Sequence, residues 1–253
     1  MSALEVVVVA LAGVLAGAIN TVVGSGTLVA FPVLLAVGYP PVVANVSNSL
    51  GLAPGSLSGA YGYREELRGQ AGHVRRLLPA SLLGAVAGAL LLLILPAGAF
   101  STIVPVLIAL ALVLVVAQPL LVRRLASRPK RPHEHGGVLL WIGVLLGGVY
   151  GGYFGAAQGV MMLGLMGVLM PHKNLQRTNA LKNLLVAMVN LTAGVVFVFL
   201  AHVAWEAVLA LAVGSVIGGQ IGARIGRKLP PAALRAIIVT VGIAALVKLT
   251  VWQ

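Results

Sequence analysis

Long apolar stretches separated by short basic loops constrain this chain more than any other feature. Residues 77–95 and 101–122 are apolar throughout, and a membrane-spanning helix needs about 20 such residues. With 60% hydrophobic and 9% charged residues, the chain has no room for a soluble domain. Backbone groups in lipid must bond within the protein, which favours helices. The sequence therefore predicts an all-α polytopic membrane protein with roughly 8–10 membrane segments, including short or re-entrant half-helices.

The two halves of the chain carry the same motifs in the same order. The matching pairs are G-V-L-A-G at 13–17 with G-V-L-L-G at 143–147, Gly84-x-x-x-Gly88 with Gly214-x-x-x-Gly218, and Leu95-Pro96 with Leu229-Pro230. Each half then has about five segments, and an odd number inverts the second half relative to the first. The expected organisation is an N-terminal membrane repeat, 1–122, a basic cytoplasmic linker, 123–137, and a C-terminal membrane repeat, 138–253.

Basic residues predict the orientation. All 17 Lys and Arg residues except Lys182 and Lys248 fall on one side of the predicted topology, in loops such as 62–76, 123–137 and 224–228. Under the positive-inside rule these loops are cytoplasmic and both termini are non-cytoplasmic, in a multi-pass protein of a prokaryotic inner membrane. The same loops explain the net charge of +12. No nucleic-acid-binding motif accompanies them, so nucleic acid is not an expected partner.

Two polar clusters interrupt apolar segments at matching places. The first is A-N-V-S-N-S-L at 44–50 and the second is T-N-A-L-K-N-L at 178–184, so Asn45 aligns with Asn179 and Ser49 with Asn183. Polar side chains are costly in lipid and need a protein, water or ligand partner. Matching clusters in two repeats favour a shared binding site. The alternative is that these side chains only hydrogen-bond helices together.

Glycine-rich breaks precede both clusters. Gly24-Ser25-Gly26 and the stretch 155–159 interrupt their segments, and the pieces that follow, 27–38 and 160–170, are too short to span a bilayer. Whether these pieces cross or re-enter is left open. Interrupted segments at corresponding positions point to a transporter site, and the positive end of a half-helix suits an anion. The alternative is that the glycines only permit close helix packing.

Acidic residues lie outside the segment interiors. They are Glu5, Glu65, Glu66, Glu134 and Glu206, all in loops or at segment ends. A proton relay or cation carrier normally uses intramembrane carboxylates. The segment interiors instead hold neutral hydrogen-bond donors and a single cation, which favour a small oxyanion as the substrate. The candidate substrate-binding residues are Asn20, Ser25, Thr27, Asn45, Ser47, Asn48, Gln158, Asn179, Lys182 and Asn183. For Lys182 the alternative is that its ammonium extends to the nearby cytoplasmic face.

The sequence lacks the residue combinations that enzymatic catalysis would need. Cysteine is absent, which excludes a thiolate nucleophile and a Cys-based metal site. Ser25 has no histidine in a segment interior to act as its base, and His133 with His135 supplies too few ligands for zinc. We therefore expect no enzyme, no catalytic residue, no metal and no cofactor.

Several stretches resemble the TauE/SafE family of membrane proteins, the sulfite exporters, over nearly the full length. They are G-S-G-T-L-V-A-F-P-V-L, A-N-V-S-N-S-L, L-P-A-S-L-L-G-A-V-A-G-A-L-L-L, T-N-A-L-K-N and G-S-V-I-G-G-Q-I-G-A-R-I-G-R-K-L-P-P. The resemblance implies export or uptake of sulfur-containing anions such as sulfite, thiosulfate or organosulfonates. Where the family commonly shows Thr-Ser, this chain has Val46-Ser47-Asn48.

The expected function is transport of such an anion, with the two inverted repeats giving alternating access to a site between them. A passive anion channel on the same repeats and a non-transporting membrane assembly factor are the alternatives. The expected partners are the small anionic substrate and the lipid bilayer, and a homodimer is left open.

Overall fold

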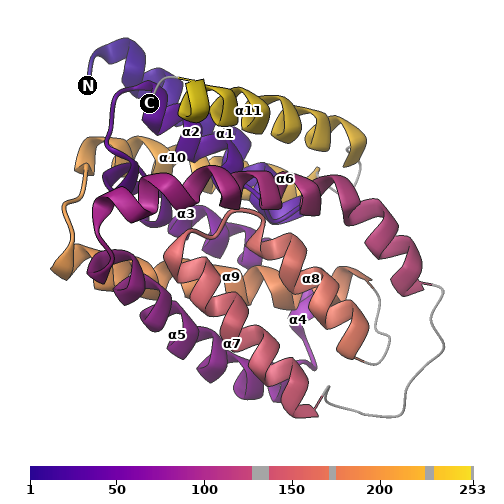
Figure 1. The fold of residues 1–253 in the computed structure, drawn as a ribbon. Helices are drawn as coiled ribbons and strands as arrows, with labels where there is room; N and C mark the ends of the chain where they lie inside the picture. Colours follow the sequence, from indigo (N-terminus) through magenta and orange to yellow (C-terminus); the bar gives the residue numbers. More distant parts are fainter. Residues whose placement is uncertain (127–136, 171–174, 226–230, 252–253) are drawn as a thin grey trace.

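The computed structural model describes residues 1–126, 137–170, 175–225 and 231–251, and within these ranges the regular structure is helical (Figure 1). The helices are α1 Ala3–Val22, α2 Thr27–Ala36, α3 Pro41–Gly62, α4 Arg64–Leu67, α5 Ala71–Ile94, α6 Ala97–Ala126, α7 Gly137–Tyr153, α8 Gln158–Leu169, α9 Leu175–Leu200, α10 Trp205–Arg224 and α11 Pro231–Val251. Helices α1, α5, α9 and α10 and residues 98–120 of α6 are long and apolar enough to cross a membrane. The prediction of an all-α polytopic membrane protein is confirmed.

The first hairpin, α1–α2, turns back inside the protein. The amino group of Met1 lies 2.8 Å from Glu206 at the start of α10, and Tyr39, just after α2, lines a pocket with Trp205 and Glu206. The hairpin therefore begins and ends at one end of the molecule. At 1.5 Å per residue α2 is about 15 Å long, half of the roughly 30 Å of a bilayer core.

The second hairpin, α7–α8, turns back in the same way. A Cβ on Gly147 would contact the Met162 side chain, and one on Gly143 would contact Leu165, so α8 runs back along α7. Figure 1 shows this hairpin entering from the end opposite to the N-terminus. Both short segments are thus re-entrant, which the sequence left open.

Packing in one half has a counterpart in the other. Helix α1 packs along α10 as α7 packs along α5, α3 packs on α10 as α9 packs on α5, and α3 and α9 meet in the middle. Small residues permit these approaches: a Cβ on Gly214 would lie 2.0 Å from the Ala10 carbonyl oxygen, and one on Gly88 would lie 2.0 Å from that of Val149. The division at 123–137 stays a prediction, because most of this linker lies outside the described residues.

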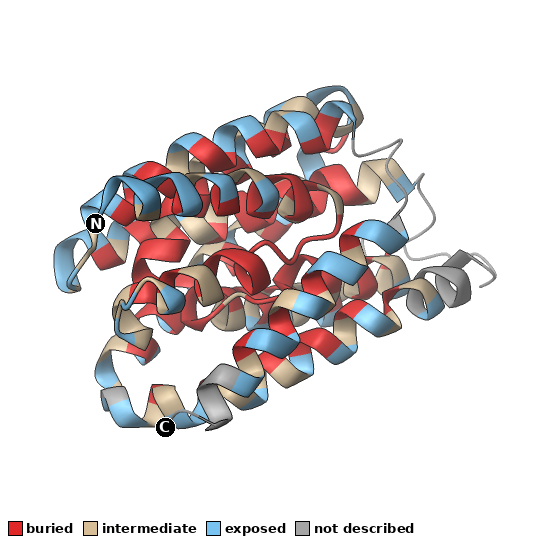
Figure 2. Cartoon of the chain, turned by 90° about the horizontal axis from the view of Figure 1, so that it is seen from above, coloured by how far each residue is buried: buried red, intermediate tan, exposed pale blue. Residues whose placement is uncertain are grey.

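Burial follows the arrangement expected in lipid. Buried residues fill the centre of the bundle, and exposed ones lie on its outer helix faces (Figure 2). Large apolar side chains such as Ile94 and Phe199, 78% and 79% exposed, cover that outer surface. Lipid solvates such side chains, so their exposure carries no hydrophobic penalty there. The informative residues are therefore the polar ones at the centre.

Candidate functional site

Both breaks end their helices with the same backbone geometry. The Gly24 amide donates to the Ile19 carbonyl at 3.0 Å, and the Gly155 amide donates to the Tyr150 carbonyl at 3.0 Å. These bonds span five residues and accompany a left-handed residue, as at many helix C-termini. The φ angles are +93° for Gly24 and +74° for Gly155, which favour glycine. The last carbonyls of α1 and α7 remain available to other donors.

The two breaks touch at the centre of the protein. The Gly159 amide donates to the Gly24 carbonyl at 2.9 Å. A Cβ on Gly24 would lie 2.5 Å from the Gly159 Cα, so only hydrogen fits at this contact. The tips of the two re-entrant hairpins, which enter from opposite ends, are therefore joined backbone to backbone.

Asparagines from each half bond to the broken helix of the other. Asn45 Nδ2 on α3 donates to the Tyr153 carbonyl at the end of α7, at 2.8 Å. Asn179 and Asn183 on α9 donate to the Thr21 carbonyl near the end of α1, at 3.3 and 3.1 Å. These bonds satisfy carbonyls that the breaks leave without helical partners. The amide nitrogens thus act as helix-to-helix bonds, one of the two roles considered for these clusters.

Other atoms of the same clusters have no partner. In the described part of the chain, the buried Oδ1 atoms of Asn45, Asn48 and Asn179 and the Oγ of Ser25 make no hydrogen bond. Buried polar atoms are nearly always bonded, and each unpaired one costs about 1–3 kcal/mol. Packing alone does not account for four such atoms around the joined breaks. They indicate a place for a polar ligand or for bound water.

Lys182 adds a buried amine to this centre. Its side chain is fully buried, and its Nζ lies 3.4 Å from the Asn20 carbonyl. The amine does not extend to the protein surface, so the alternative of reaching the cytoplasmic face is not what the structure shows. The described carboxylates lie at helix ends or in α4: Glu5, Glu65, Glu66 and Glu206. In the repeat alignment Lys182 takes the place of Asn48.

The remaining predicted residues divide between the centre and other places. Asn48 Nδ2 donates to Thr27 Oγ1 at 3.2 Å, beside the first break. Ser47 instead accepts a bond from the Ala204 amide, at 3.0 Å, near the start of α10. Gln158 folds back within its own hairpin and donates to the Gly147 carbonyl at 3.1 Å. Ser47 and Gln158 are thus bonded to backbone groups, of Ala204 and Gly147, and not to the unpartnered atoms.

Ser56 joins the network although it was not a candidate. Its Oγ accepts from Asn20 Nδ2 at 2.9 Å and from Asn190 Nδ2 at 3.2 Å. It comes eleven residues after Asn45 on α3, a spacing of about three helical turns that returns to nearly the same helix face. That periodicity could have identified it. No sequence signal marks the Thr21 and Tyr153 carbonyls, because every residue has one.

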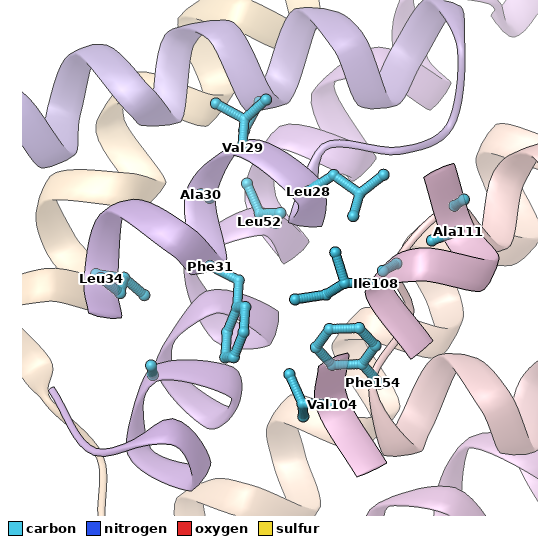
Figure 3. Close-up of a cluster of buried hydrophobic side chains, with 14 of the residues drawn as sticks. Leu28, Val29, Ala30, Phe31, Leu34, Leu52, Val104, Ile108, Ala111 and Phe154 are labelled. Carbon is cyan, nitrogen blue, oxygen red and sulfur yellow. The ribbon is translucent and has the colours of Figure 1, made fainter. Parts of the chain in front are cut away.

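An apolar wall of Phe31, Phe100 and Phe154 lies beside the second break. The Phe31 and Phe154 rings meet edge to face with centroids 5.3 Å apart, and Phe100 and Phe154 are 6.1 Å apart. Such aromatic pairs pack favourably. Figure 3 shows Phe31 of α2 and Phe154 close to Val104 and Ile108 of α6. All three rings are buried, so this side of the joined breaks is apolar.

Comparison with known proteins identifies the family of this chain. Residues 9–249 match the family described as "Sulfite exporter TauE/SafE". The chain belongs to the TauE/SafE family. No solved structure matches it significantly.

Relatives of this TauE/SafE protein bear transporter names. It is 30% identical to "Probable membrane transporter protein ORF9" of Sinorhizobium sp over 94% of this chain and 89% of that protein. It is 26% identical to "Probable membrane transporter protein YfcA" of Escherichia coli strain K12 over 93% of this chain and 86% of the relative. It is 28% identical to a "Probable membrane transporter protein" of Haemophilus influenzae over 84% of this chain and 81% of the relative. The protein is thus a membrane transporter of the TauE/SafE family, and these names give no substrate.

Proposed function

We propose that this TauE/SafE member carries a small sulfur-containing anion, such as sulfite, thiosulfate or an organosulfonate, by alternating access between its two halves. One observation carries the proposal: the breaks of both halves meet at the centre, beside the buried amine of Lys182 and the unpartnered hydroxyl of Ser25. The family name supports a sulfur oxyanion as the cargo.

The chemistry of the centre supports an anion. Helices α2 and α8 both begin at the breaks, and no side chain caps either N-terminus. The helix dipole gives each start a partial positive charge, which attracts oxyanions, although the first N–H groups of α8 are already bonded, that of Gly159 to the Gly24 carbonyl. Ser25 precedes α2 and supplies an unpartnered hydroxyl. When protonated, Lys182 supplies a positive charge that can act as the counter-ion of an anion inside the membrane.

Burial favours a carrier over the passive channel. Asn45 and Lys182 are fully buried and Ser25 is 1% exposed, so the centre is closed to both ends in this conformation. A transporter exposes such a site to one side at a time by moving one repeat against the other. Flux through a carrier saturates with anion concentration, and substrate on the far side accelerates it by exchange. A channel shows neither effect.

Ligand binding and transport test the proposal together. Purified protein is heated with sulfite, thiosulfate, sulfoacetate, taurine or sulfate, and we expect at least one sulfur anion to raise the melting temperature through mass action. The stabilising anion should then enter liposomes containing the protein with saturable, exchangeable flux. A protein that responds to no anion in the panel fits the assembly-factor alternative and contradicts the proposal. Linear flux without exchange supports the channel.

A further inference from the structure

The amine of Lys182 is buried with little to stabilise a charge. In the described part of the chain its Nζ makes one hydrogen bond, a long one of 3.4 Å to the Asn20 carbonyl. An ammonium has three N–H donors, and its transfer from water into a dry interior is costly unless an opposite charge accompanies it. One long bond leaves most of that cost uncompensated. A neutral amine, with two donors and no charge, fits the closed structure better.

Neighbouring elements supply no counter-charge. Helix α9 packs against α3, α4, α5, α7 and α8, and α1 supplies the Asn20 carbonyl. The charged and titratable groups of these elements are Tyr61 and the adjacent Tyr63, Arg64, Glu65, Glu66, His73, Arg75, Arg76, Tyr150, Tyr153, Glu5 and, on α9 itself, Arg177. Among the described residues, none of these groups forms a salt bridge with Lys182. A bound anion would be the counter-ion that the protein itself does not provide.

The repeat makes the amine a specific feature of one half. Asn48 occupies the equivalent position in the first half, where its amide donates to Thr27 beside the break. An amide there gives hydrogen bonds without charge. The second half replaces it with a fully buried amine, which can gain and lose a proton. The substitution adds protonation chemistry to a position that needs only a donor for packing.

We propose that Lys182 couples anion transport to proton transport. When the anion enters, a proton from water on that side bonds to the Nζ lone pair, and the resulting ammonium pairs with the anion. On the other side the N–H bond breaks, the proton returns to water and the anion leaves. Each cycle therefore moves one proton with one anion. This inference rests on the proposed function and specifies how its site is regulated by pH.

Proton counting tests the coupling directly. Thiosulfate binding is measured by calorimetry at pH 8 in triethanolamine and in Tris, two cationic buffers that do not compete for an anion site and whose ionisation enthalpies differ. Thiosulfate itself is fully ionised at this pH, so any buffer-dependent heat reports protons taken up by the protein. We expect uptake close to one proton per bound thiosulfate and an affinity that falls by up to about tenfold per pH unit in the alkaline range. Binding with no proton uptake overturns the coupling and leaves the proposed function standing.

Two variants test whether Lys182 is the group that takes up the proton. Lys182→Arg keeps a permanent charge, so it should bind thiosulfate without proton uptake and with little pH dependence. Arg224→Met removes an exposed charge at the end of α10 and should keep the proton uptake of the parent protein. Equal uptake by Lys182→Arg and the parent would assign the proton elsewhere and overturn the inference. If no anion of the panel binds the parent protein at any pH, the proposed function fails and this inference fails with it.

A second measurement needs no ligand. If the amine is neutral in the folded protein and charged after unfolding, the unfolded state binds more protons, so folding stability rises with pH. Thermal unfolding from pH 6 to 9 should then show the parent protein gaining melting temperature relative to Lys182→Met. Parallel curves for the two proteins would show that Lys182 does not change its protonation on folding, which contradicts the proposal.

Discussion

The amide of Asn45 shows how one side chain can have two roles. Its nitrogen donates to the Tyr153 carbonyl, whereas its oxygen is buried without a partner in the described structure. Ser25 differs, because among the described residues its hydroxyl oxygen has no hydrogen-bond partner. The folding contribution and the ligand-binding contribution of these residues should therefore separate on mutation.

Ser25→Ala should weaken anion binding without harming the fold. No hydrogen bond within the described structure is lost, so the melting temperature should stay almost unchanged or rise. A hydrogen bond to a charged ligand contributes about 1.5–3 kcal/mol, so the dissociation constant for thiosulfate should rise about tenfold or more. Calorimetry and thermal unfolding measure the two quantities. Unchanged affinity would place Ser25 outside the binding site.

Asn45→Ala should destabilise the protein instead. The variant leaves the Tyr153 carbonyl buried without its donor, which costs about 1–3 kcal/mol. Unfolding in mixed micelles gives the change in free energy. Thr102→Ala is the matched control, because it removes a hydroxyl that bonds to the Gly98 carbonyl at an exposed position. Equal losses for Asn45→Ala and Thr102→Ala would argue against the inter-half bond.

Sequence patterns located some of these residues and not others. Asn45 and Asn179 follow from the repeat alignment, and the structure places both beside the breaks. Ser47 shares the same stretch, but successive helical residues point about 100° apart, and the structure turns it toward Ala204. The carbonyls that bind the amides belong to the backbone, so no residue type could reveal them.

Helical hairpins show a similar limit at the scale of elements. Composition revealed that the pieces after both breaks are short, but length alone does not decide whether a piece crosses or returns. Packing against α10 and α5, far away in the sequence, places α1 and α7 and so determines where the hairpins turn. The repeat motifs predicted the small-residue faces, because Gly84, Gly88, Gly214 and Gly218 are where the helices touch.

Two glycines with similar backbone angles give a matched test of the contact between hairpins. Gly24 has φ +93° and Gly38 has φ +103°, so alanine should strain either backbone by about 1–3 kcal/mol. Only at Gly24 would the new Cβ also strike the other hairpin, since Gly38 has nothing within 4 Å. Gly24→Ala should thus lower stability clearly more than Gly38→Ala and impair transport. Similar losses in both would show that the hairpin contact contributes little.

For the whole molecule, the inverted halves and the basic loops give a prediction of orientation. The chain has no cysteine of its own, so single cysteines report sidedness cleanly. Arg68→Cys and Lys130→Cys should react with an impermeant thiol reagent only from the cytoplasmic side, and His202→Cys only from the opposite side, as the positive-inside rule requires. The side chains of Arg68 and His202 are exposed, whereas Lys130 lies outside the described residues. Labelling of positions 68 and 130 from opposite sides would contradict the inverted arrangement.

The pairing of α1 with α10 also has a consequence for biosynthesis. Helix α1 finds its main partner only when α10 is made, roughly 180 residues later, a delay of about 10–40 s at typical translation rates. Until α9 is made, shortly before α10, the Asn20 and Thr21 carbonyls lack the amine and amides that bond them in the finished protein. The first half must therefore remain in the membrane for this time with these backbone carbonyls lacking their hydrogen-bond partners. Slowed synthesis of the second half should extend the period in which the nascent protein is most open to proteolysis.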